Sequence, residues 1–204
     1  MSELDLYLQP TEFLDSDSLP VRDFAARATE GAAGEIAKAV ALYYAIRDGI
    51  RYDPYVMATD PEQYRASVVA GLPAAYCIQK AILLGASARA VGVPSRLGFA
   101  DVRNHLTSPK LRETMGSDLF VYHGYTELFL EGRWVKATPT YDKEYCRKAG
   151  VGPVEFDGIK DAMLPAFALD GRRNVEYLLD RGFFDDLPLE DIRKASASGK
   201  YLAP

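Results

Sequence analysis

The chain has 204 residues, of which 48% are hydrophobic and 26% are charged, a balance typical of a globular protein that can bury a sizeable core. The net charge of −5 and the lack of a cluster of Lys and Arg interleaved with aromatic residues argue against a nucleic-acid-binding surface. No stretch approaches the roughly 20 apolar residues of a membrane span, and the N-terminus lacks the features of a secretory signal, so we expect a cytoplasmic protein.

The first third of the chain is predicted to be mostly helical. Alternation of leucine with polar residues indicates a short strand at the start of the chain, on Leu4, Leu6 and Leu8. A short helix is expected after Pro20, and apolar residues at helical spacing predict a longer helix over residues 33–47. Residues 51–71 are polar and interrupted by prolines, which favours a loop with one helical turn.

The middle of the chain changes from a helical to a strand pattern. A sharp break at Gly71-Leu72-Pro73 precedes a run of strong helix formers, which predicts a helix from Cys77 to Val91 that ends at Gly92. A strand is then expected over residues 95–105, because apolar and other residues begin to alternate at its start. Residues 107–117 are predicted to form a loop or a single helical turn.

Two further strands, over residues 120–130 and 133–138, are expected to form a hairpin. The two residues between them, Glu131-Gly132, are typical of a two-residue hairpin loop. The sequence after the hairpin is punctuated by Gly and Pro, and it predicts helices near residues 175–179 and after Pro188.

The order of these elements, helices first and an antiparallel sheet second, indicates an α+β fold. We interpret residues 1–204 as a single domain with a core at about residues 33–142. The predicted N-terminal strand and helix precede this core, and a C-terminal helical extension follows it.

Cys77 is the candidate nucleophile because it begins the predicted central helix. Unpaired backbone N–H groups and the positive end of the helix dipole favour a thiolate at such a position. The same N–H groups could stabilise an oxyanion when the sulfur attacks a carbonyl. Taken alone, a single cysteine is usually explained as a small buried hydrophobic residue, so the case for catalysis depends on its partners.

His123, one of only two histidines, lies on the alternating strand and shares a face with Tyr125 and Glu127. A histidine on a sheet and a cysteine at a helix N-terminus form the pair used in thiol catalysis. A structural histidine within a polar stripe would give the same pattern.

Such an imidazole usually needs a third residue that fixes its tautomer. If Glu131-Gly132 is the hairpin loop, His123 lies opposite Thr140, and its diagonal neighbours on the same face are Thr138 and Asp142. Asp142 is the only carboxylate among them and is preferred over Thr138, although Pro139 could distort the strand and leave Asp142 in a loop.

Two segments resemble the transglutaminase-like superfamily. The first begins Tyr76-Cys77-Ile78-Gln79-Lys80 and continues to Gly92-Val93-Pro94-Ser95-Arg96; it is similar to the nucleophile helix of the family and the G-[IV]-P-[AS]-R motif that follows it. The second, His123-Gly124-Tyr125-Thr126-Glu127 to Gly132-Arg133-Trp134, resembles the strand pair that carries the catalytic histidine. The resemblance covers about residues 70–142.

Membership of this family would imply a papain-like α+β core, in which the nucleophile helix packs on an antiparallel sheet, and a Cys-His-Asp triad. It would also imply acyl-transfer or amide-hydrolysis chemistry. The position that matches the aspartate of the family is Thr138, so either Asp142 replaces that aspartate or the triad is incomplete. The loss of a triad orienter can cost roughly 10⁴-fold in rate.

Other polar residues suggest where a substrate could bind. A dense polar run at the end of a predicted strand could line the cleft beside Cys77, or could hold a loop by internal contacts; it comprises Asp101, Arg103, Asn104 and His105. Tyr125 could face the substrate or lie in the core. Cys146 is interpreted as a buried inert thiol, and no disulfide is expected. The spacing of Cys and His does not favour a metal site, and no cofactor is implied.

We therefore expect an enzyme that forms a thioester on Cys77 with His123 as base, and that hydrolyses an amide or isopeptide bond or transfers the acyl group. One alternative is an acid–base carbon–carbon lyase or cyclase that acts on a small carbonyl compound and uses His123 with Asp101 and His105. Another is a non-catalytic binding domain with a degenerate triad. A small-molecule or peptide-like substrate is expected, not a nucleic acid or a membrane, and the oligomeric state is left open.

Overall fold

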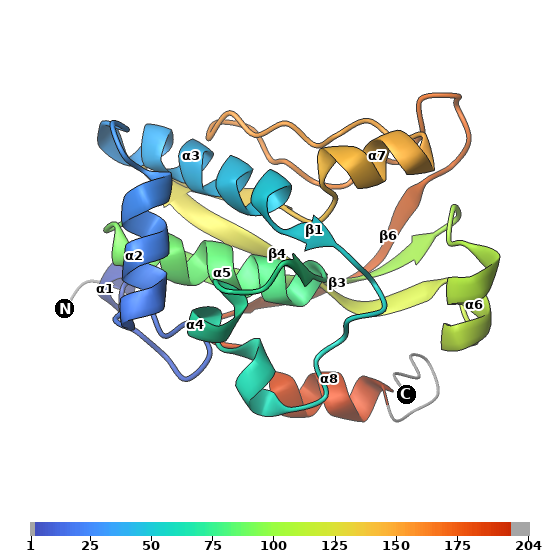
Figure 1. Cartoon of the computed structure of the whole chain (residues 1–204), viewed down its shortest axis with the longest axis horizontal. Coiled ribbons are helices and arrows are strands. Elements are labelled where there is room, and N and C mark those ends of the chain that lie inside the picture. Colours follow the sequence, from blue (N-terminus) through green and yellow to red (C-terminus); the bar gives the residue numbers. More distant parts are fainter. Residues whose placement is uncertain (1–2, 197–204) are drawn as a thin grey trace.

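The computed structural model describes residues 3–196, which form a four-stranded antiparallel sheet, a two-stranded parallel sheet and surrounding helices (Figure 1). The helices are α1 (Glu3–Leu6), α2 (Leu19–Ala28), α3 (Gly34–Gly49), the 3₁₀ helix η1 (Pro61–Tyr64), α4 (Ala66–Val69), α5 (Cys77–Ala90), α6 (Pro109–Met115), α7 (Lys143–Ala149) and α8 (Leu189–Ala195). The strands are β1 (Arg51–Tyr52), β2 (Ala74–Ala75), β3 (Ser95–Asn104), β4 (Leu119–Leu130), β5 (Arg133–Ala137) and β6 (Val175–Phe184). The predicted α+β class is confirmed.

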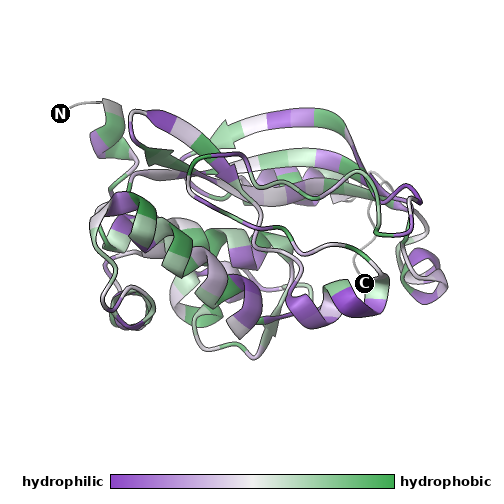
Figure 2. Cartoon of the chain, turned by 90° about the horizontal axis from the view of Figure 1, so that it is seen from above, coloured by the Kyte–Doolittle hydropathy of each residue, from purple (hydrophilic) through white to green (hydrophobic). Residues whose placement is uncertain are grey.

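Helix α5 is the centre of the fold. Every residue from Cys77 to Arg89 is buried, because α2, α3 and α4 contact the helix on one side and β3 and β4 contact it on the other. Seen from above, the helical layer lies beside the strands (Figure 2). A helix that is buried on all sides is expected to carry apolar residues on every face, and α5 does so at all but a few positions. Its position fixes the first turn of α5, and with it Cys77, against the sheet.

The large sheet has the strand order β5-β4-β3-β6, and its hairpin has the predicted register. Leu130 pairs with Arg133, and the same pairing continues to Thr126 and Ala137. Glu131 and Gly132 both have positive φ, which is what a type I′ two-residue loop requires. The hairpin prediction is therefore confirmed.

Strand β5 ends at Ala137, before the predicted pairing of His123 with Thr140 is reached. Pro139 follows closely and has no N–H to donate to a strand ladder. The backbone N–H of Thr138 bonds instead to the carbonyl of Ala162, so the chain leaves the hairpin here.

Two predicted elements are wrong. Residues 3–6 form the short helix α1, not the predicted strand. Residues 175–179 belong to strand β6, which pairs with the free edge of β3. The C-terminal part of the chain is thus not purely helical, since it supplies the fourth strand of the sheet.

The remaining predicted helices and the strand before the hairpin are confirmed. Helices α2, α3, α5 and α8 lie where the sequence predicts them, and β3 begins after the break at Gly92 and Pro94. Residues 107–117 contain the two-turn helix α6. Within residues 3–196, each helix is too short or too polar to pass through a lipid bilayer.

Candidate active site

The first turn of α5 docks on the strand that carries His123. The backbone N–H groups of Gly124, Ile78 and Cys77 lie close enough to the sulfur of Cys77 to act on the pKa of its thiol. A Cβ atom on residue 124 would lie 3.2 Å from the Cα of Ile78, so only glycine allows this approach without a shift of the helix. The residues next to Cys77 and His123 are therefore in direct contact.

The thiol of Cys77 is buried and protonated. The side chain is 9% exposed, and burial raises the pKa of the thiol to about 11, although the three N–H groups act in the opposite direction. The N–H groups of the helix N-terminus favour a thiolate as expected, but desolvation of the sulfur outweighs them.

His123 is buried and neutral. The residue is 5% exposed, and burial lowers the pKa of its imidazole to about 4. Its Nε2 atom has no hydrogen-bond partner among the residues that the structure describes. The ring packs edge-on against Tyr177 of β6, with 6.4 Å between the ring centroids. An aromatic ring therefore borders the imidazole.

A bulge in the sheet precedes His123. The pairing of β3 with β4 shifts between Ala100 and Val102, and Tyr122 has a φ of 54°, which is uncommon for a residue with a side chain. Asp101 braces this bulge, because its carboxylate accepts the N–H of Tyr122 at 3.1 Å and pairs with Arg181 at 2.6 Å. Asp101 therefore stabilises the bulge, and its carboxylate is paired with groups of the protein itself.

Thr138, at the position of the aspartate in the family, forms neutral contacts. Its hydroxyl donates to the sulfur of Met163 at 3.4 Å and lies near the phenol of Tyr177, on whose pKa it acts. Tyr177 is thus the residue that contacts both Thr138 and His123.

The carboxylate of Asp142 accepts two backbone hydrogen bonds that stabilise the local structure. One carboxylate oxygen accepts the N–H of Tyr145 at 2.8 Å and caps α7, and the other accepts the N–H of Tyr52 at 2.6 Å. None of the hydrogen bonds among residues 3–196 joins Asp142 to His123. The preference for Asp142 as the orienting residue finds no support in these contacts.

The other candidate binding residues lie in different places. Arg103 pairs with Asp118 at 3.4 Å on the surface. Asn104 donates to the phenol oxygen of Tyr141 at 3.2 Å, and Nε2 of His105 lies 3.1 Å from Glu176.

Tyr125 is buried over Gly98, and its phenol forms a hydrogen bond with Lys136. It lies on the face of β4 that points away from α5, where it lines a cavity together with Tyr177.

Cys146 resembles Cys77 in burial but has a different setting. It is buried on α7, burial raises the pKa of its thiol to about 11, and its sulfur donates to the carbonyl of Tyr141 at 3.9 Å. No histidine contact is recorded for it in the described part of the chain. Both cysteines are free.

Sequence reasoning missed three residues near the site. Lys80 is fully buried on α5, and its ammonium donates to the carbonyls of Arg47, Ile50 and Thr140 at 2.8–3.0 Å. Tyr141 and Tyr177 lie close enough to the sulfur that a thiolate on Cys77 would raise the pKa of each phenol. An apolar run could have flagged Lys80 as buried, whereas the pattern around residue 177 suggested a helix.

Cys77 and His123 are enclosed, and neither lines any of the larger cavities among the described residues. One cavity has a volume of about 660 Å³ and includes Tyr52, His105 and Tyr145. Residues 3–196 contain no group of three His, Cys, Asp or Glu side chains suited to a metal ion.

Comparison with known proteins shows a family and solved structures that the chain resembles in sequence or fold. The sequence matches the family model of the transglutaminase-like superfamily over residues 22–139. A candidate cysteine protease from Cytophaga hutchinsonii has a similar fold, with a TM-score of 0.59 and 17% identity over 91% of this chain. The match covers 48% of that protein, so the chain spans about half of its length.

A candidate protease from Parabacteroides distasonis is more distant, with a TM-score of 0.42 and 16% identity over 66% of this chain and 25% of that one. No curated protein matches the sequence.

Proposed function

The chain belongs to the transglutaminase-like superfamily, and on that premise we propose that it is a thiol-dependent enzyme with Cys77 as nucleophile and His123 as base. Hydrolysis of an amide or isopeptide bond is the first choice of reaction, and transfer of the acyl group to an amine is the second. The substrate is a peptide-like or other small acyl compound.

The observation that carries this proposal is the contact between the first turn of α5 and β4. Gly124, the strand residue next to His123, packs closely against Ile78, and its N–H acts on the pKa of the Cys77 thiol, so this strand residue borders the nucleophile. This contact supports the proposal that the cysteine of a helix N-terminus and the histidine of a sheet belong to one site, as the family resemblance implies.

The resting pair is neutral, which determines how the reaction proceeds. With the thiol pKa raised to about 11 and the imidazole pKa lowered to about 4, a thiolate–imidazolium pair is disfavoured in the closed structure. As the sulfur forms its bond to the carbonyl carbon, His123 accepts the thiol proton and the N–H groups of the first turn stabilise the oxyanion. The imidazolium then protonates the leaving amine as the thioester forms, and water or a second amine releases the acyl group.

The enzyme works with a dyad in this proposal. No carboxylate contacts the ring among the described residues, and Nε2 is left without a partner. The absence of an orienting carboxylate lowers the rate, by roughly 10⁴-fold in a serine protease that loses it, and leaves residual catalysis. We therefore expect slow turnover compared with a complete triad.

A binding domain without catalysis is the second candidate. The protonated and enclosed thiol favours it, because an inert cysteine is expected to be buried and to have a raised pKa. The two candidates differ in whether an electrophile reacts at Cys77 at neutral pH.

Acylation by p-nitrophenyl acetate distinguishes them. The protein is mixed with the ester at pH 7, and the acetylated cysteine is located by mass spectrometry of peptides. We expect acetylation at Cys77, a release of nitrophenolate that precedes slower turnover, and loss of both in Cys77→Ala.

Cys146 is the matched control, because its burial and thiol pKa resemble those of Cys77 but no histidine serves it. Cys146→Ala should react like the unchanged protein. Equal acetylation of the two cysteines, or of neither, would contradict the enzymatic proposal.

A further inference from the structure

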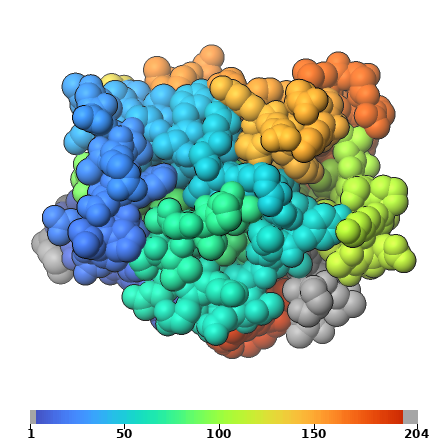
Figure 3. All heavy atoms as spheres, viewed as in Figure 1, coloured from blue at the N-terminus to red at the C-terminus, as the bar shows by residue number. Residues whose placement is uncertain are grey.

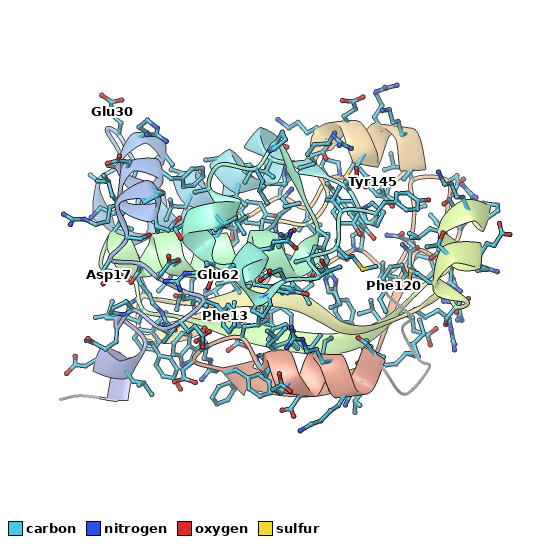
Figure 4. All side chains as sticks on the ribbon, turned by 60° about the horizontal axis from the view of Figure 1, so that its bottom comes forward. Phe13, Asp17, Glu30, Glu62, Phe120 and Tyr145 are labelled. Atoms are coloured by element: carbon cyan, nitrogen blue, oxygen red, sulfur yellow. The ribbon has the colours of Figure 1, made fainter. Side chains whose placement is uncertain are left out.

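Strands β3 and β4 fall out of register immediately before His123. Ala100 pairs with His123 and Val102 pairs with Phe120, so one residue of β3 lies opposite two residues of β4. This bulge lies near the start of β4, at Phe120, which is labelled in Figure 4. A bulge bends its strand and re-aims a neighbouring side chain, and bulges are common next to active sites.

Strand β6 is irregular at the same level of the sheet, on the other side of β3. Arg181 is an extra residue in this strand. Its neighbours Asp180 and Gly182 pair with Ala100 and Phe99, which are consecutive in β3. In Figure 3, atoms from the first third of the chain (blue to cyan) cover most of the face toward the viewer, so these strands lie behind the helical layer. The irregular parts of β4 and β6 thus flank the same short stretch of β3.

One ion pair connects these irregular segments. Oδ1 of Asp101 accepts the N–H of Tyr122 at 3.1 Å. The guanidinium of Arg181 bonds to both oxygens of the same carboxylate, with Nε at 3.0 Å and Nη2 at 2.6 Å. It also lies 4.8 Å from the centre of the Tyr122 ring. Because a bidentate pair of arginine and carboxylate has a fixed geometry, the backbone and the ring of Tyr122 are held by the same two residues.

Tyr122 needs such a restraint, since its φ of 54° lies in the left-handed region that residues with a Cβ atom avoid. A hydrogen bond from its N–H to an ionised carboxylate is about twice as strong as one to a neutral acceptor. His123 follows directly in the chain. A rotation about the N–Cα bond of Tyr122 would therefore turn the imidazole away from Tyr177, the ring against which it packs.

We propose that Asp101 and Arg181 are positioning residues for His123. They hold Tyr122 in its left-handed conformation, and this conformation keeps the imidazole enclosed near the first turn of α5. Neither residue touches the substrate in this role, which differs from the substrate-binding role that the sequence suggested for Asp101. The inference depends on the proposed function, because it concerns the histidine of the same site.

Arg181→Gln tests the inference through His123 itself. Burial lowers the pKa of this imidazole to about 4, so an imidazole that turns into solvent should have a pKa near its ordinary 6.5. In an NMR titration from about pH 8 to about pH 5, we expect the imidazole signals of His123 to stay constant in the unchanged protein and to move in Arg181→Gln.

The same change should slow the acetylation of Cys77 by p-nitrophenyl acetate. We expect a loss of about tenfold to a hundredfold, since a displacement of about 1 Å can cost roughly 10²-fold in rate. Asp101→Asn is a milder second variant, because it keeps an acceptor for the N–H of Tyr122 but removes the ion pair. The signals of His123 and the rate should change in the same direction by a smaller amount.

Arg96→Gln is the matched control. Arg96 pairs with Glu127 at 2.6 Å, the same distance as between Arg181 and Asp101, but Glu127 lies four residues along β4 from His123. The control pair is also the more buried of the two. Arg96→Gln should therefore lose at least as much stability in urea, whereas its titration of His123 and its rate of acetylation should match those of the unchanged protein.

The inference is overturned when no folded variant of the pair changes the titration of His123, or when Arg96→Gln changes it as far. Either result leaves the proposed function intact as long as Cys77 is acetylated in the unchanged protein. If Cys77 is not acetylated there, the proposed function fails, and the titration of His123 still decides whether Asp101 and Arg181 position the imidazole.

Discussion

At the scale of single residues, burial dominates the chemistry of the candidate site. The environment raises the pKa of the Cys77 thiol and lowers the pKa of the His123 imidazole, so both groups are held in their neutral forms. Access of water or of polar substrate groups would move both values back toward normal. Entry of the substrate is thus expected to activate the pair.

Thr138 offers a way to supply the missing carboxylate. Thr138 and His123 both contact Tyr177, and Nε2 of the imidazole has no partner. In Thr138→Asp, a carboxylate near the ring should favour the imidazolium and raise the pKa of His123 by about 1–3 pKa units, as measured by NMR titration. Acetylation of Cys77 should become faster as well.

Thr138→Asn is the control for this change, because it has nearly the same shape as aspartate but no charge. It should leave the pKa of His123 close to about 4. An equal rise in both variants, or none in Thr138→Asp, would show that residue 138 does not reach the imidazole.

The two candidate reactive residues could be chosen from the sequence because short motifs surround them. The pKa values of their side chains could not be predicted from the sequence. Tyr141 and Tyr177, whose phenols interact electrostatically with a thiolate on Cys77, are 64 and 100 residues away in sequence. Asp142 illustrates the same limit: the hairpin register points to it, yet Tyr52 and the first turn of α7 occupy its carboxylate.

At the scale of elements, local signals predicted the structure and distant pairings did not. The hairpin loop Glu131-Gly132 and the stop at Gly92 act within a few residues, and both were correctly inferred. Strand β6 was mistaken for a helix because its identity comes from β3, about 80 residues earlier in the chain.

Lys80 joins three elements around α5 and gives a prediction about stability. Its ammonium donates to the carbonyls of Arg47, Ile50 and Thr140, which belong to the end of α3, the residue between α3 and β1, and the segment after β5. Lys80→Met would leave three buried acceptors without a donor, so we expect the free energy of unfolding in urea to fall by about 3 kcal/mol.

Lys38→Met is the matched control, since Lys38 donates to a single carbonyl, that of Val91, at 3.4 Å. This change should cost less than about 1 kcal/mol. Similar losses in both variants would mean that the three carbonyls find other partners.

At the scale of the whole molecule, His123 links stability to pH. The unfolded chain binds a proton at this imidazole below its ordinary pKa of 6.5, whereas the folded protein does so only below about 4. Stability from this group is therefore complete above pH 6.5 and is lost as the pH falls toward 4, by roughly 3 kcal/mol.

Urea unfolding between pH 7 and pH 4.5 measures this dependence. We expect His123→Gln to show a smaller loss of stability over that range than the unchanged protein. His105→Gln, which removes the other histidine of the sequence, is the control. Identical slopes in His123→Gln and the unchanged protein would contradict a buried, neutral imidazole.

The central claim is that His123 accepts the proton of Cys77, and the pH dependence of alkylation tests it most directly. The rate of reaction of iodoacetamide with Cys77 is measured between about pH 5 and pH 9, with Cys146 in the same molecule as reference. A cysteine that reacts only as free thiolate gains about tenfold in rate per pH unit below its pKa. The account predicts a nearly flat profile for Cys77 and the tenfold slope for Cys146 and for Cys77 in His123→Gln. A tenfold slope for Cys77 in the unchanged protein would contradict it.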